Sequence, residues 1–106
     1  PDVVKKFVRG SLRGWKYTFE HPEEAAKIQL EYVKALDPQI VLEEINILRR
    51  VALSDDVSKH GYGYASPEKM KSTVDFINKN IEVSGEKLTA EQIFVPGFLP
   101  EQPILP

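Results

Sequence analysis

Cysteine is missing from all 106 residues of the chain, which excludes disulfides, thiolate metal ligands and a cysteine nucleophile within it. Long apolar runs are missing too, and no segment approaches the roughly 20 residues that a membrane-spanning helix needs. The formal net charge is −2, so positive charge is not in excess and nucleic acid is not expected as a partner. The first residues do not have the composition of a signal peptide.

The motifs of common active sites are also absent. The chain has no phosphate-binding P-loop, no G-x-G-x-x-G dinucleotide motif, no G-x-S-x-G nucleophile motif and no H-E-x-x-H zinc motif. Its two histidines, His21 and His60, are far apart in the sequence and are expected to lie at helix ends or in a loop. The residues alone therefore predict no catalytic residue, no metal site and no cofactor.

Helical periodicity is what the chain does contain. Its first segment carries apolar residues at the spacing of one helix face, and similar stripes follow later in the chain. Three of these stripes begin with a proline in the first helical turn, where its missing N–H has no intrahelical partner to lose. Those three starts are His21-Pro22, Asp37-Pro38 and Ser66-Pro67.

The predicted fold is mainly α, with four main helices, a short terminal turn and an extended proline-rich tail. Thr89 and Gln92 form a capping-box pattern that would open the terminal turn. The segment 54–65 is expected to be a loop or a broken turn, because Gly61 and Gly63 are free to adopt positive φ. The four main helices are expected at residues 2–20, 22–36, 38–53 and 67–80.

Residues 95–106 contain four prolines, which excludes a regular helix or a central strand there. The apolar side chains between these prolines predict an extended strap on a surface of this domain or of a partner. Residues 1–94 are expected to form a helical domain, and residues 95–106 its tail. Pro1 and Asp2 are typical of a first helical turn, but the capping residue before them is missing. The opening is therefore expected to be cut from a longer polypeptide.

Lys6, Arg9, Arg13 and Lys16 recur at helical spacing and form a basic stripe on the first helix. Two interpretations are open. The stripe is either a solvated face opposite the apolar one, or a docking face for an acidic partner surface. Unchanged partner binding after charge reversal at Arg9 and Arg13 would exclude the docking.

Three aromatic residues are candidates for ligand binding. Trp15 fits the apolar stripe of the first helix, so core packing is the expected role and stacking on a ligand the alternative. Tyr62 and Tyr64 flank Gly63 in the segment 54–65. They could cover an edge of the core, or they could stack on a flat ligand, since aromatic loops line many ligand clefts.

The chain resembles the C-terminal region of the NMT1/THI5-like family. The resemblance rests on Pro1-Asp2, on F-V-R-x-S-L-x-G-W-x-Y at residues 7–17, and on H-P-E-E-A at residues 21–25. Three later stretches are similar to the closing segments of the family, so the similarity covers nearly the whole chain. These stretches are residues 53–56, 61–67 and 93–100.

That family includes periplasmic solute-binding proteins of ABC importers for thiamine-pyrimidine precursors, and its wider relatives bind alkanesulfonates, taurine and nitrate. The resemblance implies the helical C-terminal part of a two-lobed α/β binding protein of type II, located in the periplasm or otherwise outside the cytoplasm. It implies a small-molecule solute and an ABC permease as partners, with no enzymatic activity. It also implies apolar surface where the rest of the lobe would sit, which predicts self-association of the isolated chain.

Two alternatives stay open. Fungal members of the superfamily are pyrimidine synthases of thiamine biosynthesis, although neither histidine of this chain matches a motif of those enzymes. The second alternative is a free-standing helical interaction module, whose resemblance to the family reflects ancestry only.

Overall fold

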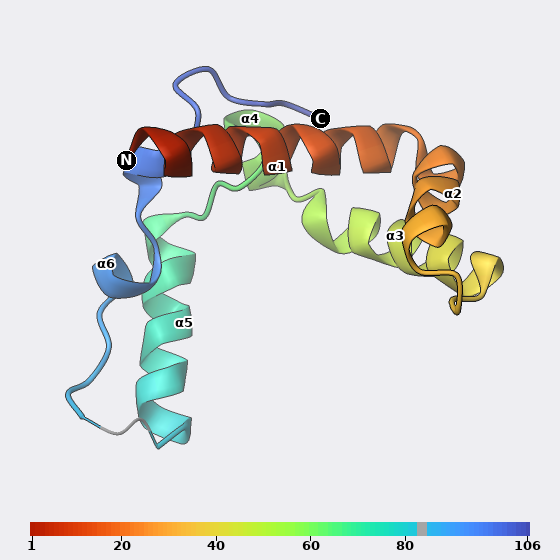
Figure 1. Cartoon of the computed structure of the whole chain (residues 1–106). Coiled ribbons are helices and arrows are strands. Elements are labelled where there is room, and N and C mark those ends of the chain that lie inside the picture. Colours follow the sequence, from red (N-terminus) through yellow and green to blue (C-terminus); the bar gives the residue numbers. More distant parts are fainter. Residues whose placement is uncertain (83–84) are drawn as a thin grey trace.

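The computed structural model describes residues 1–82 and 85–106, and the ordered elements in these two ranges are helices without any strand (Figure 1). The predicted mainly α fold is confirmed. In chain order the elements are α1 (Asp2–Glu20), α2 (Pro22–Tyr32), α3 (Pro38–Ala52), α4 (Asp55–His60), α5 (Pro67–Asn80), α6 (Ala90–Ile93) and the 3₁₀ turn η1 (Pro96–Phe98).

Capping side chains set the helix starts where the sequence predicts them. The Asp37 carboxylate accepts hydrogen bonds from the N–H groups of Gln39 and Ile40, at 2.8 and 3.3 Å, and so caps α3. The Ser66 hydroxyl caps α5 by accepting from the Lys69 N–H at 3.2 Å. The first helical position after each cap is a proline, as predicted.

α2 is shorter than predicted, because it ends at Tyr32 instead of residue 36. Tyr32 is 84% exposed and Leu36 is exposed as well, so no core lies beneath the expected last turn to stabilise it. Asp37 also precedes a proline, and the residue before a proline avoids helical backbone angles. Both effects favour a turn between α2 and α3.

The prediction of a loop or broken turn is wrong for the first half of residues 54–65, where α4 forms. The Ser54 hydroxyl caps this helix by accepting from the Val57 N–H at 3.3 Å. Two aspartates occupy the first turn, where the helix dipole favours negative charge. With six residues and one buried side chain, Val57, the helix is too short to show an apolar period. Gly61 ends it with a φ of 93°.

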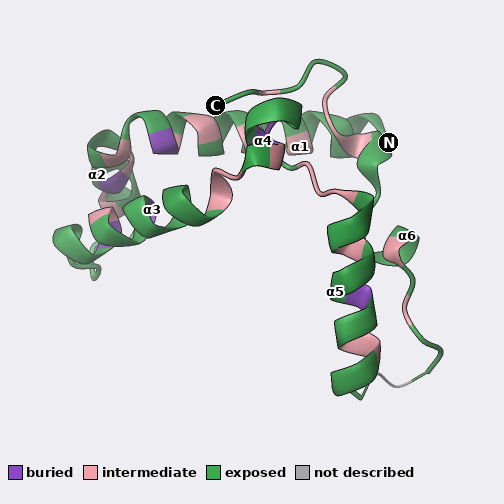
Figure 2. Cartoon of the chain, turned by 180° about the vertical axis from the view of Figure 1, so that it is seen from behind, coloured by how far each residue is buried: buried purple, intermediate pink, exposed green. Residues whose placement is uncertain are grey.

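α1 spans the molecule, with α2 and α3 folded back near its C-terminal end and α5 running steeply away near its N-terminal end (Figure 1). The core lies where α1, α2, α3 and α4 meet (Figure 2). The Phe19 ring is central to it, with its centroid 6.0 Å from that of Tyr62. The buried residues of this cluster are Phe19, Ala26, Val41, Ile45, Val57 and Tyr62.

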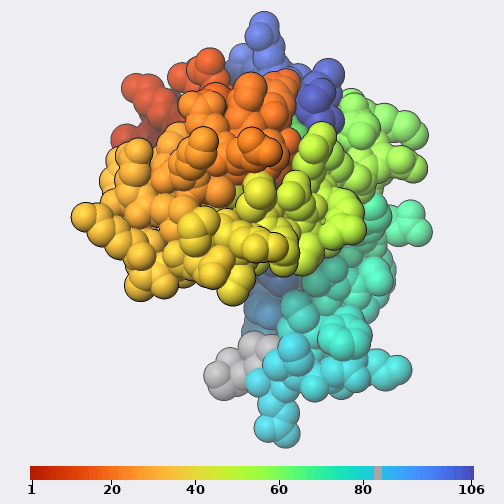
Figure 3. Space-filling view, turned by 90° about the vertical axis from the view of Figure 1, so that its right-hand side faces the viewer, coloured from red at the N-terminus to blue at the C-terminus, as the bar shows by residue number. Residues whose placement is uncertain are grey.

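α5 and α6 form an arm that extends away from this core, below the body formed by α1, α2 and α3 (Figure 3). α5 packs on α6, and its Val74 is buried outside the main cluster. The Asn78 side chain bonds twice to the Leu88 backbone: Nδ2 donates to the carbonyl at 2.8 Å, and Oδ1 accepts from the N–H at 2.9 Å. These bonds hold the segment before α6 against α5.

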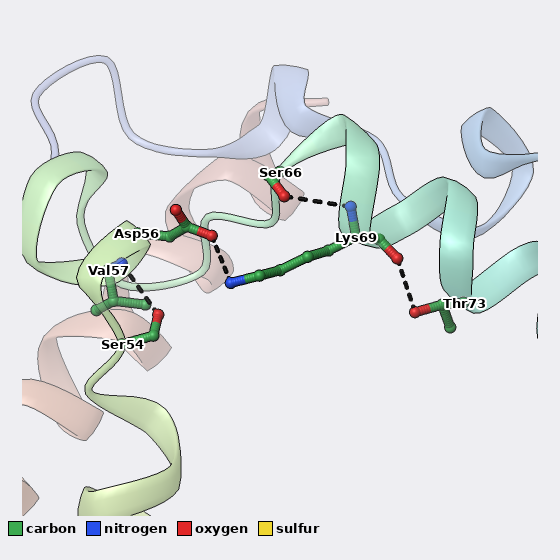
Figure 4. Close-up of polar contacts among 6 residues, drawn as sticks. All are labelled: Ser54, Asp56, Val57, Ser66, Lys69 and Thr73. Atoms are coloured by element: carbon green, nitrogen blue, oxygen red, sulfur yellow. Dashed lines mark hydrogen bonds and ion pairs between the residues drawn. The ribbon is translucent and has the colours of Figure 1, made fainter.

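An ion pair joins α4 to this arm, because the Lys69 ammonium lies 2.6 Å from the Asp56 carboxylate (Figure 4). The hydrogen bond between them lowers the pKa of Asp56 and raises the pKa of Lys69. The stabilisation from this pair is therefore present at neutral pH. It is lost as the pH falls through the lowered pKa of Asp56, and also as the pH rises through the raised pKa of Lys69.

We expect Asp56→Asn to loosen the arm at neutral pH. Since the chain has no cysteine, spin labels introduced by Ser58→Cys on α4 and Ser72→Cys on α5 report the distance between the two helices. The labelled chain should give a narrow distance distribution at pH 7, and Asp56→Asn a broad one. Asp75→Asn, which removes the Lys71 pair within α5, is the matched control and should keep the distribution narrow. An equally narrow distribution in Asp56→Asn would contradict the role of the pair.

The chain buries little of its apolar surface for its length. Its Cα radius of gyration is 16.4 Å, whereas a compact chain of this length has a value of about 13 Å. Val3, Phe7 and Val51 are between 74% and 79% exposed. Exposed apolar surface on this scale is typical of a region that another chain or domain covers.

Candidate functional site

The loop that follows α4 lies under the C-terminal tail. The Tyr62 N–H donates a hydrogen bond to the Ile104 carbonyl at 2.9 Å. Gly61 and Gly63 have φ values of 93° and 84°, and a Cβ on either one would lie about 3 Å from atoms of the tail. The tail thus packs as a strap on this domain, and the two glycines permit its close approach.

The three aromatic candidates lie in different surroundings. Tyr62 is 6% exposed and belongs to the core, where burial raises the pKa of its hydroxyl. Tyr64 is half-buried and stacks on His60, with ring centroids 4.2 Å apart. Trp15 is 46% exposed, and its ring centroid lies 5.4 Å from that of Phe19. Trp15 and Tyr64 therefore keep ring surface that a ligand could reach, whereas Tyr62 keeps little.

A groove of about 910 Å³ lies between α1 and the tail residues 96–104. Lys6, Arg9 and Arg13 of the predicted basic stripe line its helical wall. Lys5, which the sequence reasoning missed, lines it too. The signal for Lys5 was available, because Lys5 precedes Arg9 by four residues and so occupies the same helix face.

Lys16, the fourth residue of the predicted stripe, binds the tail. Its ammonium donates to the Leu105 carbonyl at 2.6 Å and pairs with the Glu20 carboxylate at 3.3 Å. The four cations that line the groove take part in none of the ion pairs found among residues 1–82 and 85–106. Two carboxylates, those of Asp2 and Glu101, also line the groove, so positive charge is in excess there.

Both histidines lie at helix ends, as the sequence predicts. His21 separates α1 from α2, and its ring lies tilted by 42° against that of Tyr17, with centroids 4.7 Å apart. The Glu24 carboxylate beside Tyr17 raises the pKa of the tyrosine hydroxyl. His60 is the last residue of α4. The Tyr17–His21 contact lies at the junction of α1 and α2, and the His60–Tyr64 stack joins α4 to the loop after it.

α3 carries a second apolar face beside the one that packs in the core. Val41 and Ile45 face the core and are buried. Ile40, Ile47 and Val51 recur at helical spacing on a neighbouring face and are 56%, 51% and 77% exposed. These three residues are called the α3 stripe below. Exposed apolar side chains therefore lie on α3 as well as on α1.

Within the part of the chain that the structure describes, no three histidine, cysteine, aspartate or glutamate side chains gather in a group that could hold a metal ion. None of the helices described there combines the length and the apolar content that crossing a bilayer requires.

The sequence model of the family described as NMT1/THI5 like matches residues 1–25, which comprise α1 and the start of α2. The chain is also 27% identical to the riboflavin-binding protein RibY of Chloroflexus aurantiacus over 107 aligned positions, which cover 94% of this chain. It spans 29% of the length of that relative. No solved structure matches it significantly. The predicted resemblance is therefore confirmed: α1 matches the family model described as NMT1/THI5 like, and nearly the whole chain is similar to a riboflavin-binding protein.

Proposed function

We propose that the chain is the helical C-terminal part of a solute-binding protein that works outside the cytoplasm and delivers a small solute to an ABC importer. The observation that carries this proposal is the similarity to a riboflavin-binding protein along 94% of the chain. The family match over α1 supports the same function. The exposed apolar faces of α1 and α3 agree with a part that packs against further structure.

The proposed solute is a thiamine-pyrimidine precursor or a related small anionic or heterocyclic compound. The family resemblance favours the pyrimidine, and the riboflavin that names the relative is likewise a flat nitrogen heterocycle. Trp15 and Tyr64 are the proposed rim residues, because both keep accessible ring surface. Tyr62 is assigned a supporting role, since its buried ring and its backbone hold the loop beneath the tail.

Such a protein would work by closing two lobes around its solute, and the permease would bind the closed form. The solute shifts the equilibrium because it contacts both lobes only when they are closed. In this mechanism the chain supplies scaffold, with the 19-residue α1 as a stiff element about 28 Å long. Binding and release need no covalent step.

Titration of riboflavin and of a hydroxymethylpyrimidine into the full-length polypeptide that carries this sequence tests the proposal. We expect one of these ligands to bind, and Tyr64→Ala to weaken that binding about tenfold, which corresponds to roughly 1.4 kcal/mol of lost stacking. Phe76→Ala changes an exposed aromatic on the α5 arm and should leave the affinity unchanged. If neither ligand binds, the proposed solute class is wrong. Equal losses of affinity in Tyr64→Ala and Phe76→Ala would mean that Tyr64 does not contact the solute.

The isolated chain is expected to self-associate through the α3 stripe, because apolar surface exposed there is stabilised by burial against a second copy. Light scattering should give a mass above the 12.0 kDa of one chain, rising with concentration. Ile47→Lys together with Val51→Lys should shift the mass toward the monomer. The matched control, Gln39→Lys with Asn46→Lys on the polar face of α3, should not. A monomeric mass of the unchanged chain at every concentration would contradict this expectation.

A further inference from the structure

The groove between α1 and the tail contains neither of the proposed rim residues, and its chemistry indicates a different occupant. We propose that an extended acidic segment of a partner protein, with carboxylates at alternate positions, binds in this groove. The proposal does not depend on solute capture, because it rests on the charge, spacing and walls of the groove alone.

The helical wall of the groove carries four cations and one carboxylate, that of Asp2, so positive charge is in excess along it. Lys5, Lys6, Arg9 and Arg13 line it and take no part in the ion pairs found within residues 1–82 and 85–106. Four like charges along two turns of one helix repel each other and are stabilised by an anionic partner. Carboxylates suit the two arginines particularly, since a guanidinium can bind a carboxylate through two parallel hydrogen bonds.

The spacing of these cations matches an extended chain better than it matches a small anion. Lys5, Arg9 and Arg13 follow each other at intervals of four residues, or about 6 Å along the helix axis. In an extended segment, alternate side chains lie on one side and are about 6.6 Å apart. Successive carboxylates can therefore meet successive cations, whereas one compact anion would reach only neighbouring members of the row.

The opposite wall consists of tail residues and is partly apolar. Phe98 and Leu99 line it and are half-buried, so they offer apolar contact to the side chains that lie between the carboxylates. Glu101 also lines this wall, and its charge opposes a continuous anionic surface such as a membrane. A segment in which acidic and apolar residues alternate can pair its carboxylates with the cations of the helical wall and pack its apolar side chains on the tail wall.

Hydrogen bonds and packing contacts fix the tail wall to the helices at several points, so this wall of the groove is already in place before a partner binds. The Ile104 carbonyl accepts from the Tyr62 N–H at 2.9 Å, and the Leu105 carbonyl accepts from the Lys16 ammonium at 2.6 Å. At the other end of the tail, η1 packs on α1. Binding an extended segment costs less entropy when both walls of the groove are already fixed than when the tail must be ordered on binding.

Fluorescence anisotropy with two labelled octapeptides of equal charge tests the proposal. One peptide alternates glutamate with leucine or alanine, in the order ELEAELEA, and the other has its four glutamates in succession. We expect the 106-residue chain to bind the alternating peptide at least threefold more tightly. Arg9→Glu with Arg13→Glu should weaken this binding at least tenfold, and the neutral pair Arg9→Gln with Arg13→Gln should weaken it less. The matched control, Lys27→Glu with Lys87→Glu, changes the net charge equally but lies outside the groove and should have a small effect.

Every other outcome overturns the proposal. Equal affinity for the two peptides would show that the spacing of the carboxylates does not matter. Equal losses of affinity in the groove and control variants would show that binding depends only on the net charge of the chain. Tighter binding to vesicles that contain phosphatidylglycerol, lost in the same groove variants, would replace the peptide with a membrane surface. Absence of peptide binding at low salt would exclude the acidic segment. Circular dichroism of each variant excludes unfolding as the cause, and the neutral pair provides the comparison if the charge-reversed pair does not fold.

Discussion

Phe19→Ala is expected to lower the free energy of unfolding by about 3–5 kcal/mol, the usual cost of truncating a buried phenylalanine. Phe19 is 3% exposed, and its ring lies 5.4 Å from Trp15 and 6.0 Å from Tyr62 between centroids. Because the buried cluster is small, this loss approaches the entire stability of a domain of this size. Urea unfolding followed by circular dichroism should therefore lose its cooperative transition.

Phe7→Ala is the matched control for this prediction. Phe7 belongs to the same helix but is 74% exposed, so its truncation removes little packing. The free energy of unfolding should change by less than about 0.5 kcal/mol. Similar losses in the two variants would mean that the core does not lie on the Phe19 face of α1. The two measurements need the same oligomeric state, which light scattering of each sample establishes.

Gly61→Ala is expected to have the second-largest effect and to release the tail. Gly61 combines a φ of 93° with a ψ of 167°, a backbone conformation that is essentially restricted to glycine. A Cβ there would also lie 3.0 Å from Pro103 Cβ and 3.1 Å from both N and O of Ile104. The strained backbone alone costs about 1–3 kcal/mol. We expect lower stability together with faster hydrogen exchange at the Tyr62 N–H, which bonds to the tail.

Gly10→Ala is the same chemical change, but it is expected to raise the stability of the chain instead of lowering it. Gly10 lies inside α1, and a Cβ there would meet nothing within 4 Å. Alanine favours a helix interior over glycine by about 1 kcal/mol, so the free energy of unfolding should rise. Slow exchange at the Tyr62 N–H should persist in this variant. Unchanged exchange in Gly61→Ala would contradict the account of the tail as a strap fixed at this loop.

Much of the fold was predictable, because helix starts depend on local chemistry. Asp37 and Ser66 stand before prolines, and their side chains cap α3 and α5 as the sequence indicates. Helix ends were harder, since the end of α2 depends on the lack of a core beneath Leu36, which is a tertiary property. α4 was missed because a six-residue helix has no apolar period, although Ser54 and the aspartates after it were visible as a cap.

The surroundings of the candidate residues were less predictable, since they depend on where the tail lies. Tyr62 and Tyr64 look alike in the sequence, yet one ring lies in the core and the other stacks on His60. Lys16 shares the spacing of the basic stripe, but its ammonium donates a hydrogen bond to the tail carbonyl of Leu105. Sequence periodicity assigns residues to a helix face. It does not show which part of that face a distant segment will cover.

We propose that this chain is the helical part of a longer solute-binding protein. The most direct test is the length of the native polypeptide that carries this sequence. Its mass and the extent of its open reading frame both give that length. The account predicts a polypeptide several times longer than this chain, with an α/β portion that covers the exposed faces of α1 and α3. A native polypeptide consisting of this chain alone would contradict the claim and would favour a free-standing helical module that binds other proteins.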